Sequence, residues 1–223
     1  PDGGGLALYQ LNGDATDESG NYNGTATGVT YGAGVFGQAG ILQPNIKTDI
    51  ATNFNLTSGQ PFSLSFWIDW QSISGNKYLY IFGFNEQDNN SHYCYISQDG
   101  TIKFNNVVGN TYGTTYTTPV LLTSNTWANI VITQTGGSEA GSFKIYKDGN
   151  FIASASFGVG TPTTTNGFTL GSSSSSTYSN TVSAKVDQVR IFNKALSAGE
   201  VTTLYEDETA CTKVTRTAGA TQI

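Results

Sequence analysis

Methionine is absent from this chain of 223 residues, and cysteine, histidine and charged side chains are scarce. A primary translation product normally begins with methionine, so we expect a processed chain or one segment of a longer polypeptide. Two cysteines are too few to staple a domain of this size, and stability must therefore come from a buried hydrophobic core. The chain contains neither a G-x-S-x-G nor an H-E-x-x-H motif, so it lacks the catalytic motifs of a serine hydrolase or a zinc protease.

Positive charge is also scarce. The formal net charge is -6, and the 10 lysines and arginines form no cluster that could follow a phosphate backbone or an anionic membrane. No apolar run approaches the ~18 residues of a membrane span, and the N-terminus lacks the basic and apolar regions of a signal peptide. We therefore expect neither a nucleic-acid partner nor membrane insertion.

The two cysteines occur in different contexts. Cys94 lies in a strand-like run, where a small buried thiol is expected, whereas Cys211 follows an acidic segment in a polar tail. The sequence leaves open a bridge between them, or one from Cys211 to another chain.

Alternating side chains predict many short strands. In residues 62–70 the predicted core face carries Leu64, Phe66, Ile68 and Trp70. The opposite face carries Ser63, Ser65, Trp67 and Asp69. Residues 127–134 alternate in the same way, and further strand patterns occupy residues 78–84, 92–97, 101–104, 142–147, 151–157, 167–171 and 184–193.

Two Asp-Gly pairs, at residues 99–100 and 148–149, join successive strand patterns and supply the positive φ angles of tight hairpin turns. Since most strands have no helical segment between them, a parallel βαβ architecture is excluded. The sequence predicts an all-β fold, a two-sheet antiparallel β-sandwich of the jelly-roll type.

One short helix is predicted near the C-terminal end. Ser197 is followed three residues later by Glu200, which is the arrangement of a capping box, and Val201, Leu204 and Tyr205 form an apolar stripe. We expect this helix to act as a lid on one end of the sandwich.

Six segments in order resemble the laminin G-like, concanavalin A-like jelly-roll domain family: "ALYQLNGDATDESGNYNGT", "PFSLSFWIDW", "TWANIVIT", "FKIYKDGNFIAS", "FTLGSS" and "AKVDQVRIFNKALSAGEVTTLY". The last of these is the most specific. The resemblance implies two stacked antiparallel sheets over residues 6–207, with residues 1–5 as a linker and residues 208–223 as a linker or tail.

The loop "GDATDESGNYNG" is a candidate calcium site, because its carboxylates, amides and glycine carbonyls are the oxygen ligands that Ca²⁺ prefers. The family resemblance implies Asp17, the carbonyl of Gly20, Asn23 and Asp187 as ligands of a structural calcium. The alternative is that Asp17 closes an Asx-type turn on its own backbone without an ion.

Catalysis is not expected. Glucanases of this sandwich fold place carboxylates two residues apart on one strand, and no such E-x-D-x-E run occurs here. Glu86 and Asp88 have the spacing but lie in a polar loop, where two solvated acids are the ordinary expectation.

Glycan binding is the remaining candidate, since sugar sites combine aromatic platforms with polar hydrogen-bonding side chains. Alternation and loop position give seven candidate contacts: Trp67, Asp69, His92, Tyr93, Tyr95, Tyr112 and Tyr116. The opposite interpretation is that these residues pack inside or beneath loops.

The predicted function is a non-catalytic binding or surface-display module. Segments at both ends resemble modules strung in tandem in structural proteins of marine tailed bacteriophages, which implies a virion-surface location. The partners would be host cell-surface polysaccharide, other virion proteins or copies of itself. The alternatives are a carbohydrate-binding module or adhesin segment of a secreted or cell-surface bacterial protein, and a structural role without a ligand.

Overall fold

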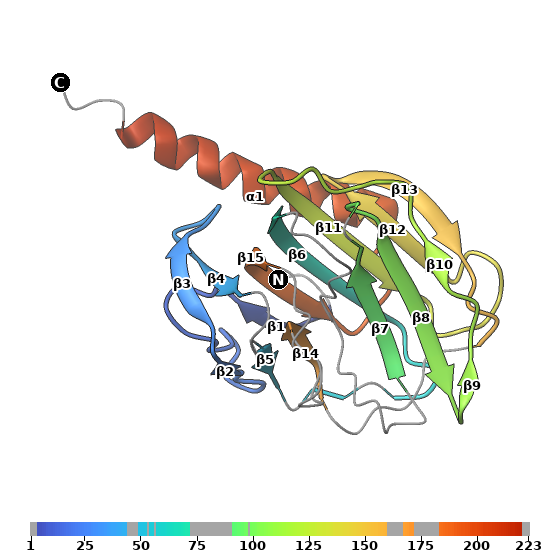
Figure 1. Ribbon diagram of the computed structural model, residues 1–223. Helices are drawn as coiled ribbons and strands as arrows, with labels where there is room; N and C mark the ends of the chain where they lie inside the picture. The colour runs from blue at the N-terminus through green and yellow to red at the C-terminus, as the bar shows by residue number, and fades with distance from the viewer. Residues whose placement is uncertain are drawn as a thin grey trace.

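The computed structural model describes residues 4–43, 49–52, 54–55, 57–71, 91–97, 99–159, 167–171 and 183–219. Of residue 49 and of residues 91–95 and 211–219 the backbone alone is described. Strands stack in two layers, and one long helix, α1, crosses behind the larger layer (Figure 1). The predicted all-β antiparallel sandwich with a C-terminal helix is confirmed.

The larger layer is one antiparallel sheet in the order β13-β12-β11-β6-β15-β4-β3, with β1 also paired to β15. Its strands are β1 (Gly5–Tyr9), β3 (Thr30–Ala33), β4 (Gln38–Leu42), β6 (Phe62–Gln71), β11 (Trp127–Gln134), β12 (Phe143–Lys147), β13 (Asn150–Ala155) and β15 (Ser183–Phe192). The long strands β6 and β15 lie next to each other at its centre.

Two smaller sheets lie opposite the large one. The first contains β7 (Ser91–Ile96), β8 (Ile102–Val108), β9 (Thr111–Tyr112) and β10 (Tyr116–Thr117). The second contains β2 (Thr25–Thr27), β5 (Asp49–Ala51) and β14 (Thr169–Gly171). All three sheets contribute to one hydrophobic core, for example through Phe66, Phe104 and Leu170.

The alternation in β6 has the predicted consequence. Leu64, Phe66 and Ile68 are fully buried on the inner face of the large sheet, where they join the main core. Burial of each such side chain contributes about 1.5–3 kcal/mol of hydrophobic free energy. The residues predicted for the opposite side, Trp67 among them, lie on what we call the outer face of the large sheet.

Both predicted hairpins are present. Gly100, with φ of 82°, lies in the turn between β7 and β8. Asp148 and Gly149, with φ of 50° and 76°, join β12 to β13. Positive φ at both central residues matches the right-handed twist of the flanking strands, which explains the Asp-Gly pair.

Helix α1 (Ala198–Gly219) begins directly after the predicted cap. The backbone N–H of Ser197 donates to Glu200 Oε2 at 2.8 Å, and the N–H of Glu200 donates back to Ser197 Oγ at 3.3 Å. These bonds and Lys194 lower the pKa of Glu200 to about 2. The helix is longer than the sequence indicated and continues into the stretch from residue 208 that was predicted as a linker or tail.

The position of α1 differs from the predicted lid at one end of the sandwich. Val201 and Leu204 pack with Val131 and Tyr146, so the helix lies across the outer face of the large sheet. Thr202 Oγ1 also donates to the carbonyl of Gly149 at 3.1 Å in the β12–β13 turn. The helix lies there because β6, β11 and β12 present large side chains on a face that would otherwise meet water.

Candidate binding site beneath the C-terminal helix

A β-bulge in β15 determines which side chains face α1. Asp187 pairs with Trp67 and Arg190 pairs with Ser65, so β15 contains one extra residue at this point. Gln188 has a φ of 49° there. Asp187 lies on the outer face, so simple alternation would place Val189 outward and Arg190 in the core. Because of the extra residue the two are exchanged: Val189 enters the core and Arg190 faces outward.

Trp67 is the centre of the contact between the large sheet and α1. Its ring stacks on Tyr205 with centroids 5.7 Å apart and meets Phe36 edge-on at 5.9 Å. The indole Nε1–H donates to Glu208 Oε2 at 2.6 Å. The side chain is 6% exposed, and Trp67, Phe36 and Tyr205 together form a small aromatic cluster under the helix, which we call the second core.

Glu208 is an acid held in this second core. Its Oε1 lies 3.0 Å from Arg190 Nε, while Oε2 accepts the bond from Trp67. Burial raises the pKa of Glu208; Arg190 and the Trp67 hydrogen bond oppose that rise, and the nearby Asp187 adds to it. The ion pair and the indole N–H therefore secure α1 to the sheet at a defined rotation of the helix.

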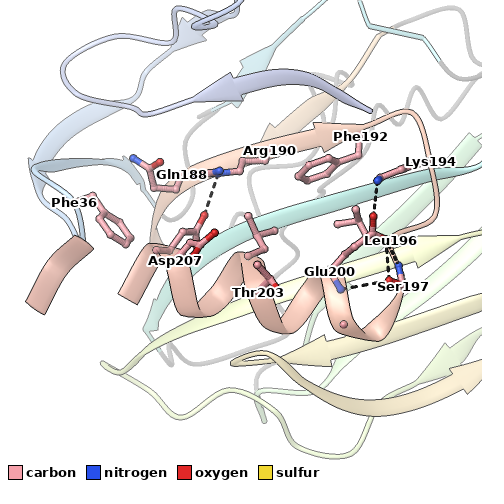
Figure 2. A pocket seen from close by; sticks show the side chains of 13 residues that line it. Phe36, Gln188, Arg190, Phe192, Lys194, Leu196, Ser197, Glu200, Thr203 and Asp207 are labelled. Carbon is pink, nitrogen blue, oxygen red and sulfur yellow. Dashed lines mark hydrogen bonds and ion pairs between the residues drawn. The ribbon is translucent and has the colours of Figure 1, made fainter. Parts of the chain in front are cut away.

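A groove of about 780 Å³ opens beside this contact, between β15 and α1 (Figure 2). Its apolar lining consists of Phe36, Phe192, Leu196 and Leu204. Its polar and charged lining consists of Gln188, Arg190, Lys194, Ser197, Glu200, Thr203, Asp207 and Glu208, with Gly199 at the helix start. The volume lies within the range of small-ligand sites.

The groove suits a ligand that has both apolar faces and hydroxyl groups. Partly buried Phe36 offers ring surface at one end and the edge of buried Phe192 lies toward the other, while Thr203 and Asp207 of α1 provide hydrogen-bonding groups. Lys194 and Glu200 form an ion pair of 2.6 Å at one end. Such mixed lining is typical of sites that bind saccharides by stacking and hydrogen bonding.

Two of the candidate glycan contacts, Trp67 and Asp69, lie on the outer face of the large sheet, as alternation predicts. Side chains from other segments cover both of them. Trp67 is covered by α1, so no sugar ring can stack on it while the helix is docked. Asp69 is 8% exposed and pairs with Lys185 Nζ at 3.6 Å. Alternation alone could not reveal this covering, because the helix comes from a segment far away in the sequence.

The other predicted contacts belong to the small sheet of β7 to β10. Tyr112 is 70% exposed on β9 and is available to a ligand. Tyr116 packs on Phe143 with ring centroids 6.2 Å apart, and burial raises its pKa, so it is mainly a core residue. His92, Tyr93 and Tyr95 lie on β7, paired with residues of β8, and their side chains are outside the described part of the chain.

Asp17 closes a turn on its own loop. Its Oδ1 accepts the N–H of Leu8 at 2.9 Å and of Ser19 at 3.1 Å, and its Oδ2 accepts the N–H of Tyr22 at 3.1 Å and the Ser19 hydroxyl. Burial by itself raises the pKa of Asp17, but these bonds outweigh it and the pKa is lowered. This geometry corresponds to the Asx-turn alternative.

The predicted calcium ligands make hydrogen bonds of their own in this arrangement, and calcium binding at this loop stays a prediction. The Asn23 side-chain oxygen accepts the N–H of Asp17 at 3.0 Å, and both Asp17 oxygens already accept hydrogen bonds. Asp187 instead accepts the N–H groups of Val35 and Phe36, at 2.9 and 3.0 Å, in another loop. Within the described residues, no three His, Cys, Asp or Glu side chains gather as a metal site.

Removing calcium should therefore leave stability unchanged. We expect the same melting temperature in EDTA and in excess CaCl₂. A calcium ion bound to the native state would raise the melting temperature by mass action, so an unchanged value means that no ion is bound. Differential scanning fluorimetry measures this directly. A melting temperature that rises by several degrees with CaCl₂ would restore Asp17, Gly20, Asn23 and Asp187 as ligands.

Residue-level prediction did not find the groove. Glu86 and Asp88, the acids considered for catalysis, lie outside the described residues. Apart from Phe36, the groove residues come from the segment 188–208, whose pattern predicts a strand followed by a helix and not a site. The available signal was the outward cluster of Arg190, Lys194, Glu200 and Glu208 around a single strand–helix connection.

Comparison with known proteins places the chain by sequence and by fold. The sequence pattern of the concanavalin A-like lectin/glucanases superfamily, of the laminin G type, matches residues 44–202. No curated protein sequence matches the chain. Among the described residues, no helix is long and apolar enough to cross a membrane.

Several solved structures share the fold. Domain 4 of AbnA, a GH43 extracellular arabinanase from Geobacillus stearothermophilus determined with arabinotriose, is 21% identical with a TM-score of 0.68, covering 92% of this chain and 100% of that domain. The binding domain of Paraclostridial mosquitocidal protein 1 is 20% identical with a TM-score of 0.69, over 92% and 52% of the two chains. The receptor-binding domain of botulinum neurotoxin type G is 17% identical with a TM-score of 0.71, over 93% and 52%. The chain thus spans about half the length of these two toxin domains.

Proposed function

The chain belongs to the concanavalin A-like lectin/glucanases superfamily, and from this membership we propose that it is a non-catalytic saccharide-binding module. We place its binding site in the groove between β15 and α1. The observation that supports the proposal best is the lining of this groove, in which phenylalanine rings face polar side chains across a space of about 780 Å³.

The arrangement of side chains favours binding over chemistry. A retaining glycosidase needs two carboxyl groups about 5 Å apart with one kept protonated, and an inverting enzyme needs a gap for water between them. Of the three groove acids, Glu208 is paired with Arg190 and Glu200 with Lys194. Only Asp207 lacks a cation partner among the described lining residues, so the groove does not offer two free carboxyl groups as an acid and a nucleophile.

The similar structures support the same class of function. They are an arabinanase domain in complex with arabinotriose and the binding or receptor-binding domains of two toxins. At identities near 20% these similarities establish the fold alone, so the ligand has to be argued from the groove itself.

Blocking the groove tests the proposal. Thr203 is an exposed position of α1 that lines the groove, so Thr203→Trp should fill the space without removing a buried contact. We expect at least a tenfold loss of affinity for any oligosaccharide that the wild-type chain binds, since a filled pocket excludes its ligand. Isothermal titration calorimetry against arabinotriose and longer oligosaccharides found on a glycan array gives the measurement.

The matched control is Ala210→Trp, which places the same side chain on an exposed part of α1 that does not line the groove. It should bind like the wild-type chain. If both variants keep full affinity, the saccharide site is elsewhere, and Tyr112 becomes the first residue to replace.

We also propose that the module is displayed on a virion surface, where it would contact host polysaccharide or other virion proteins. This rests on the sequence resemblance of its two ends to tandem modules of tailed bacteriophages. The alternative is a carbohydrate-binding module or adhesin segment of a secreted bacterial protein. Labelling of intact purified virions by antibodies to this chain supports the first, and its presence in culture medium as part of a larger secreted polypeptide supports the second.

A further inference from the structure

Both cations among the described residues that line the groove are paired with carboxylates. Arg190 Nε lies 3.0 Å from Glu208 Oε1, and Lys194 Nζ lies 2.6 Å from Glu200 Oε1. In both pairs the cation comes from β15 or the loop after it, and the carboxylate comes from α1. Figure 2 shows β15 and α1 facing each other across the groove.

A third acid makes the groove negative. Asp207 of α1 is exposed and lines the groove, and no lysine or arginine among the described lining residues remains to pair with it. The lining therefore carries three carboxylates and two cations. Asp187 is fully buried next to Gln188 of the lining, and burial raises its pKa to about 6. At higher pH it adds a further negative charge behind the groove lining.

Arg190 cannot readily change partners. Glu208 is 5% exposed and is also bonded to Trp67, so an incoming anion would have to leave a buried carboxylate without its guanidinium. Breaking a buried pair in this way is costly because the remaining charge has lost its water. Lys194 pairs with Glu200 at the surface, where both side chains are partly exposed and breaking the pair costs less; Glu200 also caps the helix.

We propose that the groove selects neutral oligosaccharides and rejects anionic ones such as uronate chains, an inference that rests on the saccharide-binding function proposed above. A neutral chain can stack on Phe36 and donate hydroxyl hydrogens to Asp207 without disturbing either ion pair. An anionic sugar ring would bring a carboxylate toward Asp207, in a described lining where carboxylates outnumber cations.

A comparison of equal-length ligands tests this. The probes are arabinotriose and neutral xylan and mannan oligosaccharides, against oligogalacturonate as the anionic probe and chitosan oligosaccharide as the cationic one. We expect anionic chains to bind about tenfold or more weakly than neutral ones, the size of effect that one unpaired surface charge gives at short range. Neutral binding should change little between about 0.05 M and about 0.5 M NaCl, since screening acts only between charges.

Charge variants locate the effect. Asp207→Asn should raise affinity for oligogalacturonate several-fold, while the matched variant Asp99→Asn, which removes one negative charge at the β7–β8 turn of the opposite layer, should not. Chitosan chains should bind at least as tightly as neutral ones, because Asp207 attracts a cation. Anionic chains that bind the wild-type groove as tightly as neutral ones, and are blocked by Thr203→Trp, would overturn the charge inference while the binding function stands. If no probe of any charge is blocked by Thr203→Trp, the proposed site itself is wrong, and the charge inference is refuted with it.

Discussion

Trp67→Ala is expected to lower the free energy of unfolding by about 3–5 kcal/mol, the usual cost of truncating a buried aromatic side chain. For a chain of this size the melting temperature should fall by about 10 °C. The reason is that Trp67 is 6% exposed and joins β6 to two other segments, the loop of Phe36 and, through Tyr205 and Glu208, helix α1. Thermal unfolding followed by circular dichroism measures the loss.

The loss should appear first in the helix. Hydrogen exchange should rise in α1 before it rises in the inner strands, because α1 is held by a small second core and not by the main one. The groove lies between α1 and β15, so saccharide binding should weaken together with helix protection.

Two variants separate the contributions of Trp67. Trp67→Phe keeps most of the ring contact but removes the donor to Glu208 Oε2, and should cost about 1–3 kcal/mol. Trp127→Ala removes a partly exposed tryptophan from β11 of the same sheet and should cost less than Trp67→Ala. If Trp67→Ala melts like the wild type with α1 exchange unchanged, the helix is not anchored by this residue.

The free energy of unfolding should fall as pH rises from about 4.5 to about 7. Paired carboxylates with a lowered pKa have the opposite effect, since they make stability rise with pH. Burial raises the pKa of Asp187 from 3.8 to about 6, against the opposing effect of the Phe36 and Val35 N–H groups and of Gln188. In this window the folded state holds a proton that the unfolded state has released. Linkage then makes folding less favourable with rising pH, by about 2 kcal/mol for Asp187.

Among the described residues, the other groups with shifted pKa values do not cancel this trend. The pKa of Glu208 is raised by burial, so its contribution has the same sign. The pKa values of Asp17, Asp99 and Glu200 are lowered, and the stability they contribute is lost only at lower pH, as they are protonated. Urea unfolding at a series of pH values gives the slope.

Asp187→Asn tests the assignment. Asparagine keeps an oxygen for the N–H groups of Val35 and Phe36 and cannot ionise, so the variant should be more stable than the wild type at pH 7 and show a flatter slope. Asp17→Asn is the matched control with the opposite sign: it should destabilise at pH 7, because the four donors around Asp17 favour the carboxylate. An unchanged slope in Asp187→Asn would assign the pH dependence to other groups.

Local pattern was sufficient to predict the sandwich. The alternation in residues 62–70 placed Leu64, Phe66 and Ile68 in the core, because a strand's side chains point to alternate faces whatever surrounds it. The Asp-Gly pairs fixed the hairpins, and the Ser197–Glu200 capping box fixed the start of α1. Each of these features depends on residues close together in the chain.

Only the tertiary structure decided what covers the outer face and where a ligand fits. Alternation placed Trp67 on that face but could not show that Tyr205 and Glu208, about 140 residues later, cover it. A single extra residue at Gln188 turned Arg190 outward, and a bulge has no reliable local signature. The groove exists because α1 packs over β11 and β12 and stands clear of part of β15, and that placement depends on contacts between segments distant in sequence.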